Sequence, residues 1–211
     1  MNKLLPVHLA ISLPSASADG FFLILSFMQM LTDLLQKPVG KIEVEQLAAK
    51  ASAQTFSAKD LIDLSFHQDE QIGFRAAWIL ERVYSNHQDR FLPHATDFLE
   101  KLPLQQNLSA LRHYVKILAF ITNRKTSPEI KAIITDYETD TIVEVVFAWL
   151  IDENIPVAVK SHCLNILANL IPKHQWIKEE LIDTMAFLVD KESIAFFAKV
   201  KQIRKQLKVK S

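Results

Sequence analysis

The chain has 211 residues, of which 24 are basic, 24 are acidic and only three are glycine. These glycines stand far apart, which excludes the glycine-rich loops that bind dinucleotides or phosphates in several large enzyme classes. A single cysteine, Cys163, excludes an internal disulfide and a zinc site built from several thiolates. Because the formal net charge is zero, an anionic partner can be attracted only by a local basic patch.

The N-terminal segment 1–30 differs from the rest of the chain, because it carries only two charged residues. Its apolar run and small residues allow a signal peptide cleaved after Ala18, which would export the chain. Alternatively, the segment adds a helix at 21–36, or translation begins at Met28 or Met30. The apolar run falls short of the about 20 residues that cross a bilayer, so we expect no stable membrane span and a cytoplasmic protein.

From about residue 42 the apolar residues recur every three or four positions, a pattern typical of amphipathic helices. Ser57 and the Ser127-Pro128 pair are typical helix starts. The connections are short, which favours antiparallel neighbours. No run of residues is typical of a strand, so the sequence predicts an all-helical protein. The predicted helices are 21–36, 41–53, 57–67, 70–85, 88–101, 106–123, 128–136, 139–152, 155–171, 175–189 and 192–208.

Three of these helices share one apolar pattern, at offsets 0, 4, 5, 7, 8 and 11 from Ile72, Ala110 and Val159. The pattern returns after 38 and then 49 residues, as expected for an array of helical repeats. Cys163 falls on this pattern, so we expect a small core residue rather than a metal ligand. No H-x-x-x-H or H-E-x-x-H motif occurs, and neither a metal nor another cofactor is expected.

The segments 73–83 and 156–164 resemble the second helices of paired-helix repeats in the HEAT and armadillo-like superfamily. The resemblance covers roughly residues 42–207 and contains no diagnostic catalytic motif. It implies an all-α fold, a right-handed α-solenoid of antiparallel helix pairs, in which the second helix of each pair lines a concave surface. We therefore expect one solenoid domain over 31–211, after the apolar segment 1–30, and no enzymatic activity.

A line of basic and aromatic side chains runs along the faces of two successive repeats. Arg75, Trp78 and Arg82 are three and four residues apart, so they lie on one face of their helix. The matching face of the next repeat carries further cations, whereas that of the third is neutral and includes His162. Together they form either an ordinary solvated surface or, where repeats stack, a concave groove for an acidic peptide or another anion. The candidate partner-binding residues are Arg75, Trp78, Arg82, Arg112, His113, Lys116 and Arg124.

Two functions fit this pattern. The favoured one is a non-enzymatic scaffold or adaptor that binds a protein partner or an acidic peptide on the concave face. The alternative is a HEAT-like DNA-binding protein or a glycosylase for alkylated bases, with cations on phosphates and Trp78 stacked on a base. That reaction also needs a carboxylate, for which Glu81 is the nearest candidate. The basic end, 199–211, is expected to be a terminal capping helix rather than a nucleic-acid or membrane arm.

Overall fold

The computed structural model describes residues 28–51 and 55–208, and every regular element within these ranges is helical. Residues 28–36 are helical and form the first helical stretch of the described residues. The α-helices that follow are α2 (Lys41–Lys50), α3 (Ala58–Leu64), α4 (Glu70–Asn86), α5 (Gln88–Phe91), α6 (Ala95–Lys101), α7 (Leu108–Ile121), α8 (Pro128–Asp136), α9 (Asp140–Ile151), α10 (Val157–Leu170), α11 (Ile177–Leu188) and α12 (Ile194–Gln206). Two short 3-10 helices, η1 (Leu92–His94) and η2 (Leu102–Leu104), flank α6. The predicted all-α fold is therefore confirmed.

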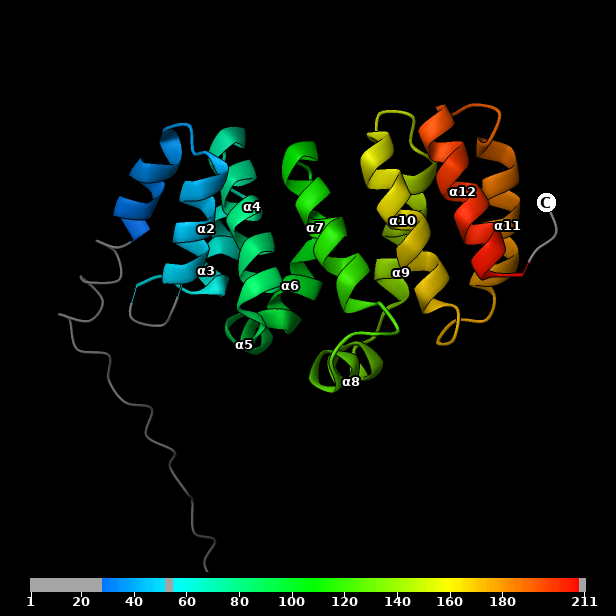
Figure 1. Cartoon of the computed structure of the whole chain (residues 1–211), viewed down its shortest axis with the longest axis horizontal. Coiled ribbons are helices and arrows are strands. Elements are labelled where there is room, and N and C mark those ends of the chain that lie inside the picture. Colours follow the sequence, from blue (N-terminus) through cyan, green and yellow to red (C-terminus); the bar gives the residue numbers. More distant parts are fainter. Residues whose placement is uncertain (1–27, 52–54, 209–211) are drawn as a thin grey trace, which may run out of the picture.

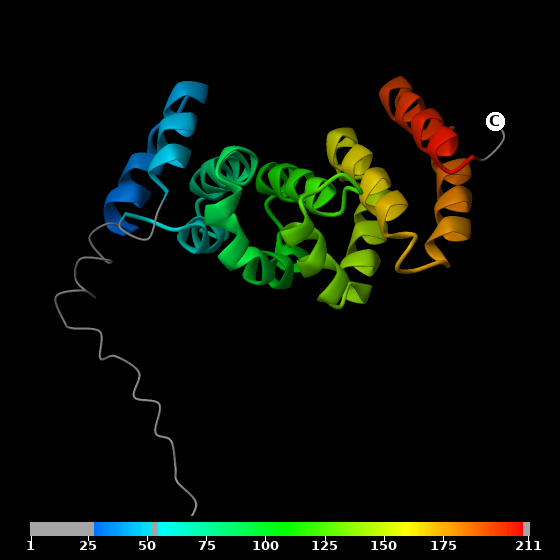
Figure 2. The ribbon, with the colours of Figure 1, turned by 60° about the horizontal axis from the view of Figure 1, so that its bottom comes forward.

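The helices form two layers along a curved array, as Figures 1 and 2 show. One layer contains α2, α4, α7, α10 and α12, each of which contacts the next. The other layer contains α3, α6, α9 and α11; α3 packs on α4, while α9 and α11 pack on α10. In Figure 2 the array is bent into an arc, and α4, α7 and α10 lie on its inner side. This is the predicted α-solenoid, with the second helix of each pair on the concave face.

The core lies between the two layers and consists of the residues that the shared apolar pattern selects. All of the pattern positions on α4, α7 and α10 are at most 4 % exposed. Cys163 is among them, and burial raises the pKa of its thiol, so it is a core residue as expected. On the last helix, Phe196, Val200 and Ile203 are buried, and α12 packs against α10 as a terminal helix of the array.

The helix boundaries follow local sequence signals. The hydroxyl of Ser57 accepts a bond from the amide of Asp60 at the start of α3, and Ser127 caps α8 in the same way. The predicted helix 88–101 is wrong as one element, because α5, η1 and α6 divide it. Pro93 lies in η1 and has no amide hydrogen with which to continue a regular α-helix. Smaller differences occur where α2 and α3 end earlier, and α11 begins later, than predicted.

The helix at 28–36 is an integral part of the first repeat. Its residues Leu31 and Leu35 are 2 % and 0 % exposed. The Arg75 guanidinium of α4 donates to the carbonyl oxygens of Leu35 at 2.6 Å and Gln36 at 3.1 Å, where this helix ends. The remainder of the predicted N-terminal segment, residues 1–27, lies outside the described residues, so a signal peptide or a later start stays a prediction. No helix in the described part of the chain is long and apolar enough to cross a membrane.

Candidate binding groove on the concave face

A groove of about 480 Å³ opens on the concave layer and is lined by residues of α2, α4, α7 and α10. These four helices lie side by side in Figures 1 and 2, so a ligand here would contact several repeats at once. The lining residues are Lys41, Val44, Glu45, Phe74, Trp78, Glu81, Arg82, Arg112, His113, Lys116 and His162.

The buried carboxylate of Glu81 organises the centre of this groove. It is 4 % exposed, and its oxygens lie 2.6 Å from Nδ1 of His113 and 2.5 Å from Nζ of Lys116. Burial raises the pKa of Glu81, but the bonds and charges of His113 and Lys116 lower it by more, to about 2. Glu81 is therefore ionised at neutral pH, and it holds two side chains of α7 in fixed positions against α4.

The rings of Phe74 and Trp78 pack against His113 of this cluster. The ring centroids of Phe74 and Trp78 on α4 are 5.9 Å apart, and His113 of α7 lies 5.5 Å from Phe74 and 6.3 Å from Trp78. Trp78 is half-buried and packs against the hydrophobic core. It therefore offers one rigid apolar surface to the groove, because its position is fixed by neighbours on both α4 and α7.

A second carboxylate joins α2 to α4. Glu45 accepts from Nη2 of Arg82 and from Nδ2 of Asn86, each at 2.8 Å. The Nε atom of Arg82 is buried and has no hydrogen-bond partner, and the same is true of Nδ1 of His162. Within residues 28–51 and 55–208 these are the only two buried side-chain nitrogen or oxygen atoms without a hydrogen-bond partner, and both residues line the groove. A hydrogen-bonding group in the groove, from water or from a ligand, would satisfy both atoms.

The pKa of His162 depends on burial and on the charges around the groove. Burial lowers its pKa to about 4, and the cations Lys116, Lys199 and Arg112 act in the same direction while Glu81 opposes them. The imidazole of His162 is therefore neutral at pH 7. Of the lining residues, Lys41, Arg82, Arg112 and Lys116 are cationic and two are carboxylates, so the groove has a positive balance. Both Lys41 and Arg112 are exposed, and their charged groups make no hydrogen bond or ion pair with other described residues.

Five of the seven predicted binding residues line this one groove: Trp78, Arg82, Arg112, His113 and Lys116. The other two do not. Arg75 instead binds the carbonyl groups that end the helix at 28–36, and Arg124 lines a separate hollow beyond the end of α7. Lys41, Glu45 and Phe74 line the groove without having been predicted. Phe74 could have been predicted from helical spacing, because it stands four residues before Trp78. Lys41 and Glu45 could not, because α2 lies outside the three helices that share the apolar pattern.

Other site chemistries find little support in the described ranges. They contain no group of three or more His, Cys, Asp and Glu residues that could hold a metal ion. Glu81, the carboxylate considered for base excision, has both oxygens engaged, and a pKa of about 2 makes it a weak base.

Comparison with known proteins identifies the repeat. The family model of the HEAT repeat domain matches residues 31–208, nearly the whole of the described part of the chain. No curated protein matches the chain. The matched range includes every helix from α2 to α12, and the observed pairs of antiparallel helices are those that the match implies. The chain therefore belongs to the HEAT repeat family.

Proposed function

We propose that the protein is a non-enzymatic scaffold that binds an acidic segment of a partner protein in the concave groove. The observation that carries this proposal is the combination of a positive charge balance with one fixed aromatic surface in a groove that spans four helices. Bulky aromatic and arginine side chains are the residues most enriched among the energetically important contacts of protein interfaces. HEAT repeats generally offer extended concave surfaces of this kind.

The cations of the groove differ in how they could act. Lys116 and Arg82 are already held by Glu81 and Glu45, so little conformational entropy is lost when they meet a ligand. Arg112 is exposed and unpaired within the described ranges, so its guanidinium is free for a bidentate contact with an incoming carboxylate. Trp78 lines the same groove and supplies apolar area for a hydrophobic residue of the same segment.

Nucleic acid is the weaker alternative. A phosphate backbone is bound most strongly by a continuous row of free cations, and each free cation releases counterions from the polymer. In the groove, two carboxylates lie among four cations, and two of those cations are already paired with them. These carboxylates would repel phosphates, whereas a protein segment with separated acidic residues can avoid them.

The test is fluorescence anisotropy with the full chain and a labelled twelve-residue peptide of alternating Glu and Leu. Matched probes are the Lys and Leu peptide of the same length and a single-stranded twelve-residue DNA. The variant Lys41→Glu/Arg112→Glu changes both unpaired cations of the groove, while Lys125→Glu/Lys178→Glu changes two exposed lysines outside it. We expect the groove variant to weaken binding of the Glu and Leu peptide at least tenfold, and the control variant to weaken it less than twofold.

Two results would overturn the proposal. Equal weakening by both variants would show that the peptide responds only to overall charge. If the DNA binds more tightly than the Glu and Leu peptide, and the groove variant loses that binding, the groove is a nucleic-acid site instead. Both double variants change exposed side chains only, so thermal melts within about 2 °C of wild type are expected, and they confirm that folding is intact.

A further inference from the structure

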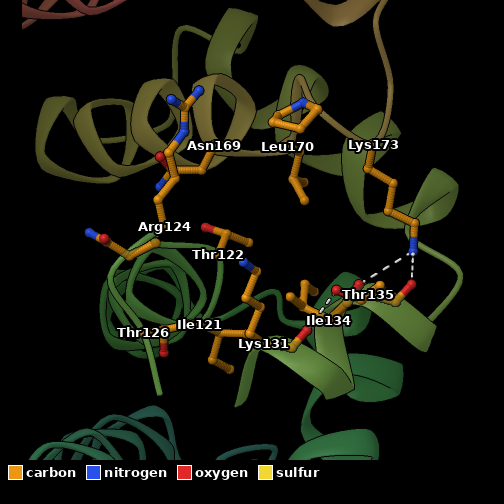
Figure 3. A pocket seen from close by; sticks show the side chains of 12 residues that line it. Ile121, Thr122, Arg124, Thr126, Lys131, Ile134, Thr135, Asn169, Leu170 and Lys173 are labelled. Atoms are coloured by element: carbon orange, nitrogen blue, oxygen red, sulfur yellow. Dashed lines mark hydrogen bonds between the residues drawn. The ribbon is translucent and has the colours of Figure 1, made fainter. Parts of the chain in front are cut away.

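A second hollow, of about 630 Å³, lies where the ends of α7 and α10 meet α8 (Figure 3). It is separate from the concave groove, because the two share no lining residue. Along α7, Lys116 faces the groove and Ile121 borders the hollow, and Arg124 follows after the helix ends. The volume falls in the range of about 300–1,000 Å³ that is typical of small-molecule sites.

The hollow exists because α8 is an insertion in the repeat. The apolar pattern returns after 38 residues between α4 and α7, but after 49 residues between α7 and α10. Only the second interval contains two α-helices of nine residues or more, α8 and α9. A helix-pair repeat needs only one helix between two helices of the concave layer, so α8 is the additional one. In Figure 1, α8 lies at one edge of the array, away from the two regular layers. Insertions in helical repeats commonly form binding surfaces on one side of the array.

Side-chain hydrogen bonds define both ends of α8. At its start, the hydroxyl of Ser127 accepts from the amide of Ile130. At its end, the ammonium group of Lys173 donates to the carbonyl oxygens of Ile134 at 3.3 Å and Thr135 at 3.0 Å, and also to that of Tyr137. Figure 3 shows two of these contacts at the side of the hollow. Lys173 therefore ties the end of α8, one wall of the hollow, to the segment that follows α10.

The lining combines an apolar floor with free cations. Ile121, Ile134 and Leu170 come from three different helices and are buried against the core. Arg124 and Lys131 are exposed, and the guanidinium of Arg124 and the ammonium group of Lys131 form no hydrogen bond or ion pair with residues of the described ranges. In Figure 3, Lys131 extends toward Thr122 across the hollow, and Arg124 reaches toward α10 beside Asn169.

The charge of the hollow is not balanced by acids. None of its described lining residues is a carboxylate, in contrast to the groove, where Glu45 and Glu81 compensate part of the positive charge. Lys173 is a third cation at this site, but its ammonium group is occupied by the carbonyl groups of α8. Arg124 and Lys131 therefore remain to meet one anionic group from outside, above an apolar surface.

We propose that this hollow binds a small organic carboxylate with an apolar body. The carboxylate binds Arg124, whose guanidinium can form two parallel hydrogen bonds, and Lys131 adds a second positive charge to the same lining. The apolar body lies on Ile121, Ile134 and Leu170, which removes it from water. The site is independent of the concave groove and of the partner proposed for it, so the two proposals can fail separately.

The experiment is calorimetric titration of the full chain with decanoate below its micelle concentration. Decan-1-ol and decyltrimethylammonium are matched ligands with the same chain but neutral and positive headgroups. The variant Arg124→Gln/Lys131→Gln removes both free cations of the hollow. The control Lys125→Gln/Lys178→Gln removes the same charge from exposed positions outside it, one of which is adjacent to Arg124 in sequence.

We expect decanoate to bind in the micromolar to low millimolar range, at least tenfold more tightly than either matched ligand. The hollow variant should lose at least tenfold in affinity, and the control variant and Arg112→Glu should each change it less than twofold. Three outcomes would overturn the proposal: no heat of binding at millimolar decanoate, equal affinity for all three ligands, or equal loss in the hollow and control variants. Unchanged circular dichroism of all variants shows that lost binding is not lost folding.

Discussion

Replacing Glu81 with glutamine removes the charge that joins α4 to α7 but keeps the shape of the side chain. Glu81 is 4 % exposed and accepts from His113 and Lys116 of α7. Burial raises its pKa, but these two partners lower it by more, from the ordinary value of 4.5 to about 2. A shift of this size corresponds to about 3 kcal/mol of folding free energy. We expect Glu81→Gln to lower the free energy of unfolding by about that amount at neutral pH.

The effect has a defined dependence on pH. Glu81 binds its proton less tightly in the folded chain than in the unfolded chain, so its ionised form stabilises the fold above pH 4.5. The stabilisation is lost as the pH falls through the folded pKa of about 2. From the two pKa values, the contribution falls from about 3 kcal/mol at pH 6 to about 1 kcal/mol at pH 3. The difference between wild type and Glu81→Gln should shrink by about 2 kcal/mol over this interval.

The measurement is urea unfolding followed by far-ultraviolet circular dichroism at each pH unit from 3 to 7. Glu45→Gln is the matched control, because it also removes one groove carboxylate, whose side chain is 32 % exposed. An ion pair with that exposure contributes about 1 kcal/mol or less. If the difference for Glu81→Gln is independent of pH, or no larger than that for Glu45→Gln, the buried carboxylate does not hold α4 to α7 as argued.

Three further predictions concern the fold. Leu167→Ala empties a fully buried position of α10 and should cost about 2–5 kcal/mol in urea unfolding. Tyr114→Phe removes a buried hydroxyl that lies 2.5 Å from the hydroxyl of Ser65, and should cost about 1–2 kcal/mol in the same assay. Deleting residues 1–40 removes the carbonyl groups that Arg75 binds and should lower the Tm by more than deleting residues 1–27; equal melts would show that the helix at 28–36 does not stabilise the first repeat.

The solenoid could be predicted because its information is local. Apolar residues at helical spacing determine which face of each helix is buried, and the return of one pattern in three helices indicates stacked repeats. Local signals also placed the starts of α3 and α8 at Ser57 and Ser127. The division of the segment 88–101 was not predicted, although Pro93 lies inside it. Proline is common in the first turn of a helix, so its presence near residue 88 did not by itself indicate a break.

The groove could be predicted only as far as neighbours share a helix face. Trp78 and Arg82 are four residues apart, so helix geometry alone places them together. The same rule also selected Arg75, but its guanidinium is taken by carbonyl groups about 40 residues earlier in the chain. Helix spacing carries no information about contacts between distant segments. For the same reason, it could not show that Glu81 would pair with two cations of α7.

Arg124 shows how an insertion redirects a pattern. On a regular repeat, a cation after the end of α7 would continue the strip of the concave face, as the sequence suggested. Here the chain turns away into α8, and Arg124 comes to lie at the hollow that α8 encloses. The irregular interval of 49 residues was the available signal, because an interval longer than that of the previous repeat requires additional chain between the paired helices.

The concave groove and the hollow beside α8 differ in whether their cations are paired with acids, and this difference favours different ligands. In the groove, the cations Arg82 and Lys116 are compensated by carboxylates that also join neighbouring helices. The carboxylates hold these cations in place but also reduce the net positive potential of the groove. This favours recognition of one arrangement of acidic groups over attraction of any polyanion. In the hollow, Arg124 and Lys131 have no nearby acid among its lining residues and face an apolar floor. That arrangement favours a single anionic group with an apolar body, because a larger polymer could bring its charge to the rim but could not cover the floor.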